Sequence, residues 1–280
     1  VPKYAHIAPF VKVDESTGNK RKLSKRKDPE AAVSFYHEKG VPVEAVMIYL
    51  ATVPNSNFEA WFDCNKDAKI EDFKFEFKKI GSSGGALFDL DKLMNISKNY
   101  LSKLTKDEIY DRVLNYSKEF DTEFYDLLVK YEDYSKSIFN IEREQKKPRK
   151  DYATYADAKK QIWYMYDELF DKYFENYDFG KITDEEEIKN IINTYIDEYY
   201  DENDDKDTWF NKIKELSEKL GYAGNMKEYK ENPDAFKGNV ADVSTVIRVA
   251  LTSSSMTPDL YELLRLMGKD RIKERFSKLN

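Results

Sequence analysis

A basic run at residues 20–28 offers the most distinctive chemistry in the sequence. Residues 21–27 hold three lysines, two arginines and one serine, although the whole chain has a formal net charge of −7. Lysine and arginine neutralise phosphate charge, while a serine hydroxyl and loop N–H groups donate hydrogen bonds to phosphate oxygens. The run could therefore wrap a triphosphate. A solvated basic stretch or a localisation signal would have the same composition, and charge alone favours that second interpretation.

The composition indicates a protein with real cores and wide solvated surfaces. Of the 280 residues, 41% are hydrophobic and 35% are charged, and the mean hydropathy is −0.76. No apolar stretch approaches the roughly 20 residues of a membrane span, so we expect no membrane association. Cys64 is the one cysteine, and the two histidines, His6 and His37, are far apart. We therefore expect neither a disulfide nor a metal site, and a reducing, cytoplasmic location.

Charge is distributed unevenly along the chain. Residues 142–150 include five basic side chains, whereas residues 165–210 hold sixteen acidic against four basic residues. This alternation suits a protein that touches a polyanion with some faces and keeps others clear. For the acidic block itself, a solvated face is the favoured interpretation.

The elements that would position the basic run are mostly helical. Asp28 and Pro29 predict a helix start directly after the run. The pairs Thr105–Glu108 and Thr183–Glu186 each fit a capping box, and helical apolar spacing continues almost to the end of the chain.

Two further sequence patterns predict one more helix and one short strand. Thr257 and Pro258 predict the start of a last helix that Gly268 closes. The alternation of Phe73, Phe75 and Phe77 with charged residues predicts, by its period, a short strand.

Several motifs, in order along the chain, resemble those of one known family. Lys22-Leu-Ser-Lys-Arg26 matches the KMSKS-type signature of class I aminoacyl-tRNA synthetases, in the KLSKR form usual for glutamyl-tRNA synthetases. The preceding Tyr4-Ala-His-Ile resembles the strand that leads into this loop, and residues 41–51 resemble the helix after it. Residues 87–93 are similar to the family's FDxxKL element. Residues 247–252, 256–260 and 266–269 resemble its RxALTG…TPxLxE…LLG pattern. This order, from residue 3 to about 275, replaces the localisation-signal interpretation.

The resemblance implies a mainly α fold. It comprises a short N-terminal remnant of the catalytic domain, a helical stem-contact region and an all-helical anticodon-binding unit. The implied parts are a catalytic-domain tail at 1–28, a stem-contact region at 29–100, and two helical anticodon-binding subdomains at 101–180 and 181–280. Helices through 105–279 favour the bacterial type, since glutaminyl enzymes and archaeal or eukaryotic glutamyl enzymes carry β-barrels there. The family has a short helix and turn at 73–77, and this expectation overrules the strand.

The family's nucleotide-binding domain, with its HIGH-type motif, would precede Val1, and nothing in the sequence resembles it. We therefore expect a C-terminal part that does not activate glutamate alone and holds no cofactor. In the intact enzyme the resemblance implies ATP with Mg²⁺, L-glutamate and a glutamate-accepting tRNA, and we expect a monomer. Lys22 and Lys25 would contact the ATP phosphates, Ser24 would hold the loop and donate to phosphate, and Arg26 would support it.

The resemblance also implies anticodon-reading residues. Its C-terminal motif names Arg248, Thr257, Pro258 and Leu260 as contacts to splayed bases. An alternative for the last three is structural, with Thr257-Pro258 starting a helix and Leu260 filling a core. For the first anticodon base, Arg143 and Arg149 remain equal candidates.

The sequence therefore predicts the tRNA-binding part of a glutamate–tRNA ligase. The alternatives are a non-discriminating glutamyl or a glutaminyl enzyme, or a helical protein-interaction scaffold unrelated to tRNA.

Overall fold

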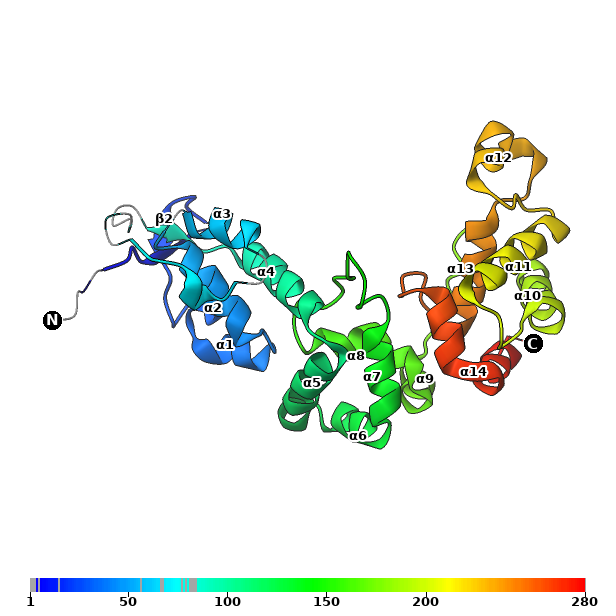
Figure 1. Ribbon diagram of the computed structural model, residues 1–280, viewed down its shortest axis with the longest axis horizontal. Helices are drawn as coiled ribbons and strands as arrows, with labels where there is room; N and C mark the ends of the chain where they lie inside the picture. The colour runs from blue at the N-terminus through cyan, green and yellow to red at the C-terminus, as the bar shows by residue number, and fades with distance from the viewer. Residues whose placement is uncertain are drawn as a thin grey trace. The chain divides into compact units, whose positions relative to one another are not determined.

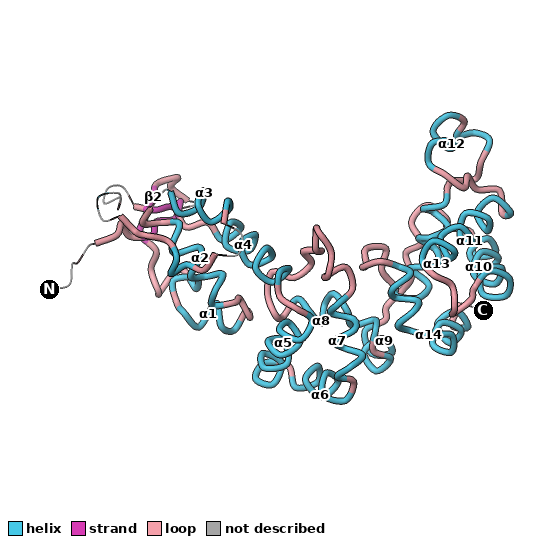
Figure 2. The backbone as a smooth tube through the Cα atoms, viewed as in Figure 1, coloured by secondary structure: helices cyan, strands magenta, loops and turns pink. Residues whose placement is uncertain are grey.

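The computed structural model describes residues 4, 6–14, 16–55, 57–65, 68–76, 78, 80 and 85–279. This part contains fourteen α-helices and one three-stranded sheet (Figure 1). Helix dominates along the backbone (Figure 2), which confirms the predicted mainly α fold class. The chain divides into two compact units: unit 1 has residues 1–130 and 143–161, and unit 2 has residues 131–142 and 162–280. No helix of the described residues has the length and apolarity to cross a membrane.

The sheet of unit 1 has the strand order β2-β1-β3. β1 (Phe10–Val13) pairs antiparallel with β2 (Lys20–Lys22) and parallel with β3 (Ala86–Leu87). The strand expected at residues 4–7 is wrong, because residues 6–9 have no regular structure and Ala5 lies outside the described residues. Pro9 has no N–H to donate, so the ladder starts only after it.

Seven helices build the rest of unit 1 as far as its residues are described. α2 packs against α4, and α5 packs against α6. Their core includes fully buried aliphatic and aromatic residues such as Leu93, Ile109, Val113 and Leu128. The helices are α1 (Val33–Glu38), α2 (Val43–Thr52), α3 (Asn57–Cys64), α4 (Leu90–Lys103), α5 (Lys106–Phe120), α6 (Thr122–Lys130) and α8 (Asp157–Ile162).

The alternation at 73–77 suggested a strand, which the family resemblance overruled in favour of a short helix and turn; the described residues of this segment form no strand. Ile70–Asp72 forms one 3₁₀ turn, residues 73–76 are irregular, and Phe77 lies outside the described residues. The rings of Phe73 and Phe75 instead both lie against the buried ring of Phe58, with centroids 5.1 and 5.9 Å away. Alternate residues reach one shared partner, and this produces a strand-like period without a sheet.

Unit 2 is built around α13 (Val240–Thr252), which packs against α10, α11 and α14. Eight of its thirteen residues are buried, as a helix surrounded by others requires. The other helices are α7 (Glu132–Asn140), α9 (Asp167–Tyr173), α10 (Glu185–Thr194), α11 (Lys206–Lys219), α12 (Met226–Glu231) and α14 (Leu260–Ser277). The central place of α13 matters because this helix carries Arg248.

The predicted helix ends had mixed outcomes. The Thr105–Glu108 capping box is confirmed, since each side chain meets the other's backbone N–H. At α10 the cap is Asp184, not Thr183, because the Asp184 carboxylate accepts the N–H of Glu187 at 2.9 Å. Gly268 breaks α14 with φ 74°, as the sequence suggested, but a second helical stretch continues to Ser277.

Candidate nucleic-acid interface

The KLSKR segment forms the end of β2 and the turn after it. The N–H of Leu23 donates to the carbonyl of Phe10 on β1 at 2.9 Å. The N–H groups of Lys27 and Asp28 both donate to the carbonyl of Ser24, at 2.9 and 2.8 Å. The segment is therefore a turn of defined shape at the edge of the sheet.

Asp28 holds this turn together. Its carboxylate is 2% exposed and accepts hydrogen bonds from both terminal nitrogens of the Arg21 guanidinium, at 2.7 and 2.8 Å. It also accepts the N–H of Ser24 at 2.8 Å. These hydrogen bonds, first those from Arg21, hold the pKa of the Asp28 carboxyl well below its usual range. Asp28 precedes the 3₁₀ turn Pro29–Ala31 but does not cap it with its side chain, contrary to the sequence prediction.

The remaining cations of the run face solvent. All five are exposed, and none pairs with a carboxylate of the described residues; they are Lys20, Lys22, Lys25, Arg26 and Lys27. Ser24 is half-buried, and its hydroxyl accepts the N–H of Arg26 at 3.4 Å. The structure thus brings Lys22, Ser24, Lys25 and Arg26 together, as charges that could neutralise a polyanion.

A second group of predicted residues meets at the junction of α13 and α14. One guanidinium nitrogen of Arg248, Nη1, donates to the hydroxyl of Thr257 and, at 2.8 Å, to the carbonyl of Pro258. Thr257 is 6% exposed and Leu260 is 3% exposed, so both belong to the packed interior, while Arg248 is half-buried. The helix itself begins at Leu260 with Asp259 as its cap, two residues later than the sequence predicted.

Residues elsewhere in unit 2 also bind the loop between α13 and α14 at both of its ends. The backbone N–H of Asp259 donates to the carboxylate of Glu142 at 3.2 Å, and the Asp259 carboxylate pairs with Lys206 at 2.8 Å. Glu142 has the left-handed φ of 54°, which non-glycine residues adopt rarely. The Ser253 hydroxyl donates to the carbonyl of Asn176 at 2.5 Å.

Arg143 and Arg149 both lie in unit 1 and have different surroundings. Nη1 of Arg143 donates to the carbonyls of Leu101 and Leu104 at 2.8 and 2.9 Å, and so covers the C-terminal end of α4. Desolvation lowers the pKa of Arg143. Arg149 is 30% exposed and pairs with Asp151, its neighbour along the chain.

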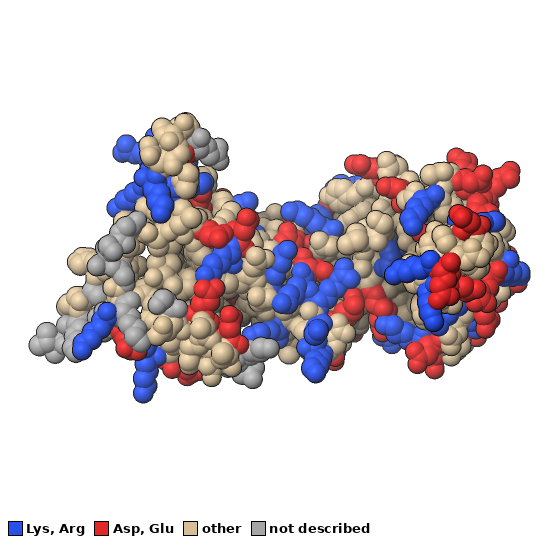
Figure 3. Space-filling model, turned by 90° about the horizontal axis from the view of Figure 1, so that it is seen from above, with Lys and Arg blue, Asp and Glu red and all other residues tan. Residues whose placement is uncertain are grey.

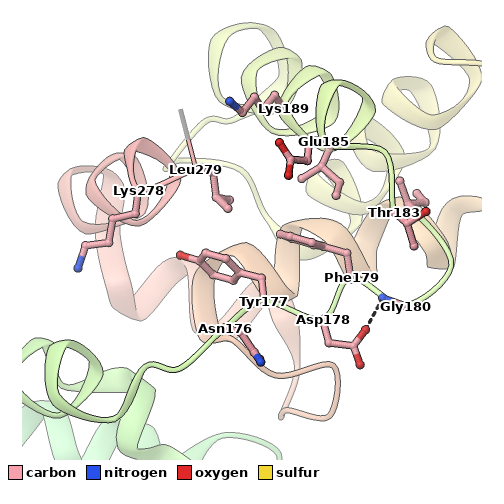
Figure 4. Close-up of a pocket in the computed structure, with 12 residues that line it drawn as sticks. Asn176, Tyr177, Asp178, Phe179, Gly180, Thr183, Glu185, Lys189, Lys278 and Leu279 are labelled. Atoms are coloured by element: carbon pink, nitrogen blue, oxygen red, sulfur yellow. Dashed lines mark hydrogen bonds between the residues drawn. The ribbon is translucent and has the colours of Figure 1, made fainter.

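A pocket of about 770 Å³ lies in unit 2, and none of the residues predicted to contact ATP or tRNA lines it. Its wall includes Tyr177 and Phe179, whose stacked rings have centroids 5.5 Å apart, together with Leu279 and the charged Lys189 (Figure 4). Asn176, which also lines it, is the residue that accepts the Ser253 hydroxyl. The pocket therefore adjoins the loop between α13 and α14.

Acidic side chains gather on the face of unit 2 that Figure 3 shows. Three consecutive glutamates, Glu185–Glu187, occupy the first turn of α10, where the helix dipole favours negative charge. In the described part of the chain, no group of three His, Cys, Asp or Glu residues could hold a metal ion.

The sequence analysis missed the roles of two residues that shape these sites. Asp28 was taken only as a helix cap, and Glu142 was not considered. The acidic residues on either side of the basic run could have suggested the first. No sequence signal could have found the second, because 117 positions separate Glu142 from Asp259.

The family described as "Anticodon binding domain" matches residues 123–279, more than half of the chain. This match covers the junction around Arg248, and the chain belongs to this family of anticodon-binding domains. It is 48% identical over 278 residues to a glutamate–tRNA ligase of Clostridium perfringens, which covers 99% of this chain and 50% of that protein. A glutamate–tRNA ligase of Acetivibrio thermocellus is 45% identical over 282 residues, with 100% and 50% coverage.

A solved structure supports the fold. The glutamate–tRNA synthetase of Elizabethkingia anophelis matches with a TM-score of 0.63 and 17% identity, and covers 100% of this chain and 51% of that one. The chain spans about half the length of the curated relatives it matches.

Proposed function

We propose that this chain is the tRNA-binding part of a glutamate–tRNA ligase, and that the α13–α14 junction reads the anticodon. One observation carries this proposal: Arg248, half-exposed, is oriented by Thr257 and Pro258 within the region that matches the anticodon-binding family. An arginine held in this way is preorganised to stack on or hydrogen-bond an unstacked base. The choice of glutamate as the amino acid follows from the similarity to glutamate–tRNA ligases.

Among the other residues predicted to contact the anticodon, the buried ones shape the site and the exposed ones would contact RNA. Thr257 and Leu260 are buried, so their role is to shape the junction, with Thr257 acting through Arg248. For the first anticodon base we favour Arg149, because Arg143 donates to the end of α4. Exposed basic residues of the same segment, such as Lys146 and Lys147, would add contacts to phosphate.

The KLSKR turn is proposed to act only in the intact enzyme. Lys22 and Lys25 would contact the ATP phosphates during glutamate activation, Ser24 would hold the turn, and Arg26 would support it. In the intact enzyme Mg²⁺ would accompany ATP. By itself the chain would bind tRNA as a cytoplasmic monomer and would not activate glutamate.

The test is binding of labelled anticodon stem-loops to the 280-residue chain, followed by fluorescence anisotropy. A stem-loop with the glutamate anticodon should bind at least tenfold more tightly than the same stem-loop with an unrelated anticodon. A stem-loop with a glutamine anticodon shows whether the protein discriminates between the two. Failure to bind any stem-loop at low salt would contradict the proposal and favour a protein-interaction scaffold.

A further inference from the structure

Met256 stands out on the loop between α13 and α14 because it is 80% exposed. The next most exposed large hydrophobic residue in the described part of unit 2 is Met226, at 44%. Thr257 and Pro258, which follow Met256 in the chain, are buried. An isolated apolar side chain at a surface needs no explanation by itself. What distinguishes Met256 is the backbone that carries it.

The loop backbone around Met256 is fixed by its own hydroxyl groups. The N–H of Met256 donates to the Ser254 hydroxyl at 3.3 Å, and that hydroxyl donates to the Met256 carbonyl at 3.1 Å. The Thr252 hydroxyl accepts the N–H of Ser254 at 3.2 Å. Ser253, with its left-handed φ of 56°, ends α13 at the start of this loop.

Both ends of the loop are also anchored outside it. Ser253 donates to the carbonyl of Asn176, and Arg248 donates to Thr257 and Pro258. The Asp259 N–H is held by Glu142. Met256 is thus an apolar projection on a preorganised loop, one residue from the partners of a cationic guanidinium.

We propose that Met256 packs against the face of an unstacked base of the bound RNA. This inference rests on the proposed function and adds a contact to it. A thioether is flexible and polarizable and makes favourable contacts with aromatic rings. Apolar side chains, methionine included, are used as wedges against nucleobases, and single-stranded loops offer the unstacked bases that such a side chain can meet. Arg248 beside it would supply the charge that draws the phosphate backbone near.

The experiment uses the whole chain labelled with ¹³C at the methionine methyl groups and titrated with the glutamate anticodon stem-loop. The six methionines give six signals, and Met256→Leu assigns the one of interest. We expect the Met256 methyl signal to move upfield on binding, as the ring current of a stacked base requires. The Met226 signal should stay in place.

Affinity provides the second measurement. Met256→Ala should weaken stem-loop binding by about fivefold to twentyfold, and Met256→Leu should keep most of the affinity. Met226→Ala, the matched control on α12, should change it by less than about twofold.

The outcomes separate this inference from the proposed function. RNA binding with an unmoved Met256 methyl signal, or with full affinity in Met256→Ala, overturns the inference alone. Absence of any RNA binding overturns both. A Met256 signal that shifts with protein concentration when no RNA is present would identify a second copy of the chain as the occupant, and would also overturn it.

Discussion

Nη1 of Arg248 lies 2.8 Å from the carbonyl oxygen of Pro258 and donates a hydrogen bond to it. The bond joins the second half of α13 to the residue pair that precedes α14, across a loop whose tip is exposed. A residue proposed to contact RNA therefore also sets the shape of its own site. Experiments on Arg248 must for this reason compare variants that preserve the fold with variants that do not.

The basic run should divide into one structural cation and several free ones. Arg21→Ala leaves the buried Asp28 carboxylate without its guanidinium partner, so we expect it to lower the melting temperature clearly. Lys25→Ala removes an exposed charge and should leave the melting temperature within about 1–2 °C of the parent. Thermal denaturation followed by circular dichroism measures both. Equal effects of the two substitutions would contradict the assignment of Arg21 as the anchor.

Substitution of Arg143 should destabilise the fold, whereas substitution of Arg149 should affect mainly RNA binding. Arg143→Ala removes two hydrogen bonds from the end of α4 and should cost about 1–3 kcal/mol in the free energy of unfolding. Arg149→Ala loses the part-exposed ion pair with Asp151 and should cost less than Arg143→Ala does.

Hydrogen exchange of peptides from the C-terminal part of α4 locates the effect of Arg143→Ala, and stem-loop binding measures the effect of Arg149→Ala. We expect faster exchange there in the Arg143 variant alone, and weaker RNA binding in the Arg149 variant. Loss of binding only in an Arg143 variant whose α4 exchange is unchanged would reverse our choice between the two arginines.

Local signals in the sequence were enough for the helical fold but not for its long-range contacts. Thr105 and Glu108 cap their helix as predicted because both partners lie within one turn. At the start of α10 two adjacent residues, Thr183 and Asp184, could each cap the helix. The structure has Asp184 as the cap, one residue later than the sequence predicted. Phe73 misled by period, because its spacing reflects a shared contact with Phe58 rather than a strand.

For the candidate sites too, residues close together in the sequence could be predicted and contacts between distant segments could not. The KLSKR turn and the pair Arg248–Thr257 lie within short stretches of sequence, and the family resemblance was sufficient to name them. The anchoring of Asp259 by Glu142 depends on a tertiary contact between distant segments. The exposure of Met256 depends on which face of its loop is covered, and a loop has no apolar periodicity from which this could be predicted.

In unit 2 the buried Arg275 pairs with the part-exposed Asp167, and substitutions of the two partners should differ in their cost. Arg275 is 1% exposed, donates to Asp167, and lies over the ring of Phe170 with its guanidinium carbon 3.3 Å from the centroid. Asp167→Ala should destabilise unit 2 by about 2–3 kcal/mol, because it leaves the buried guanidinium without its carboxylate, which is itself part-exposed.

Arg275→Met should cost much less, about 1 kcal/mol. The methionine keeps the packing against Phe170, and Asp167 retains Arg271 at 2.9 Å. Urea denaturation of both variants measures the difference. A larger loss in Arg275→Met than in Asp167→Ala would show that the arginine stabilises the fold through more than charge compensation.

Alkaline pH should weaken unit 2 through Tyr134. Burial raises the pKa of Tyr134 to about 12 from an ordinary value of 10, and its hydroxyl donates to the carbonyl of Met165 at 3.0 Å. The folded state thus holds this proton more tightly than the unfolded state. The resulting stability is complete below pH 10 and is lost as the pH rises towards 12, in total about 2–3 kcal/mol.

Tyr134→Phe removes the ionisable group, so its unfolding free energy should fall less steeply between pH 10 and pH 12. Phenolate absorbance at 295 nm, recorded with circular dichroism, should show one tyrosine fewer titrating with the unfolding transition. Parallel pH profiles for the two proteins would disprove a special role for Tyr134.

The central claim is that this chain binds tRNA through the junction around Arg248. The most direct measurement is the affinity of the 280-residue chain for glutamate tRNA across a salt series, for the parent, Arg248→Ala, Arg248→Lys and Arg265→Ala. Arg265 is the control, because it lies on α14 in the same unit, with a side chain that is 59% exposed and pairs with Glu262. We predict binding that weakens steeply with salt, a loss of about tenfold or more in Arg248→Ala, partial recovery in Arg248→Lys, and a change below about twofold in Arg265→Ala. No binding at low salt, or equal affinities for folded Arg248→Ala and the parent, would contradict the account.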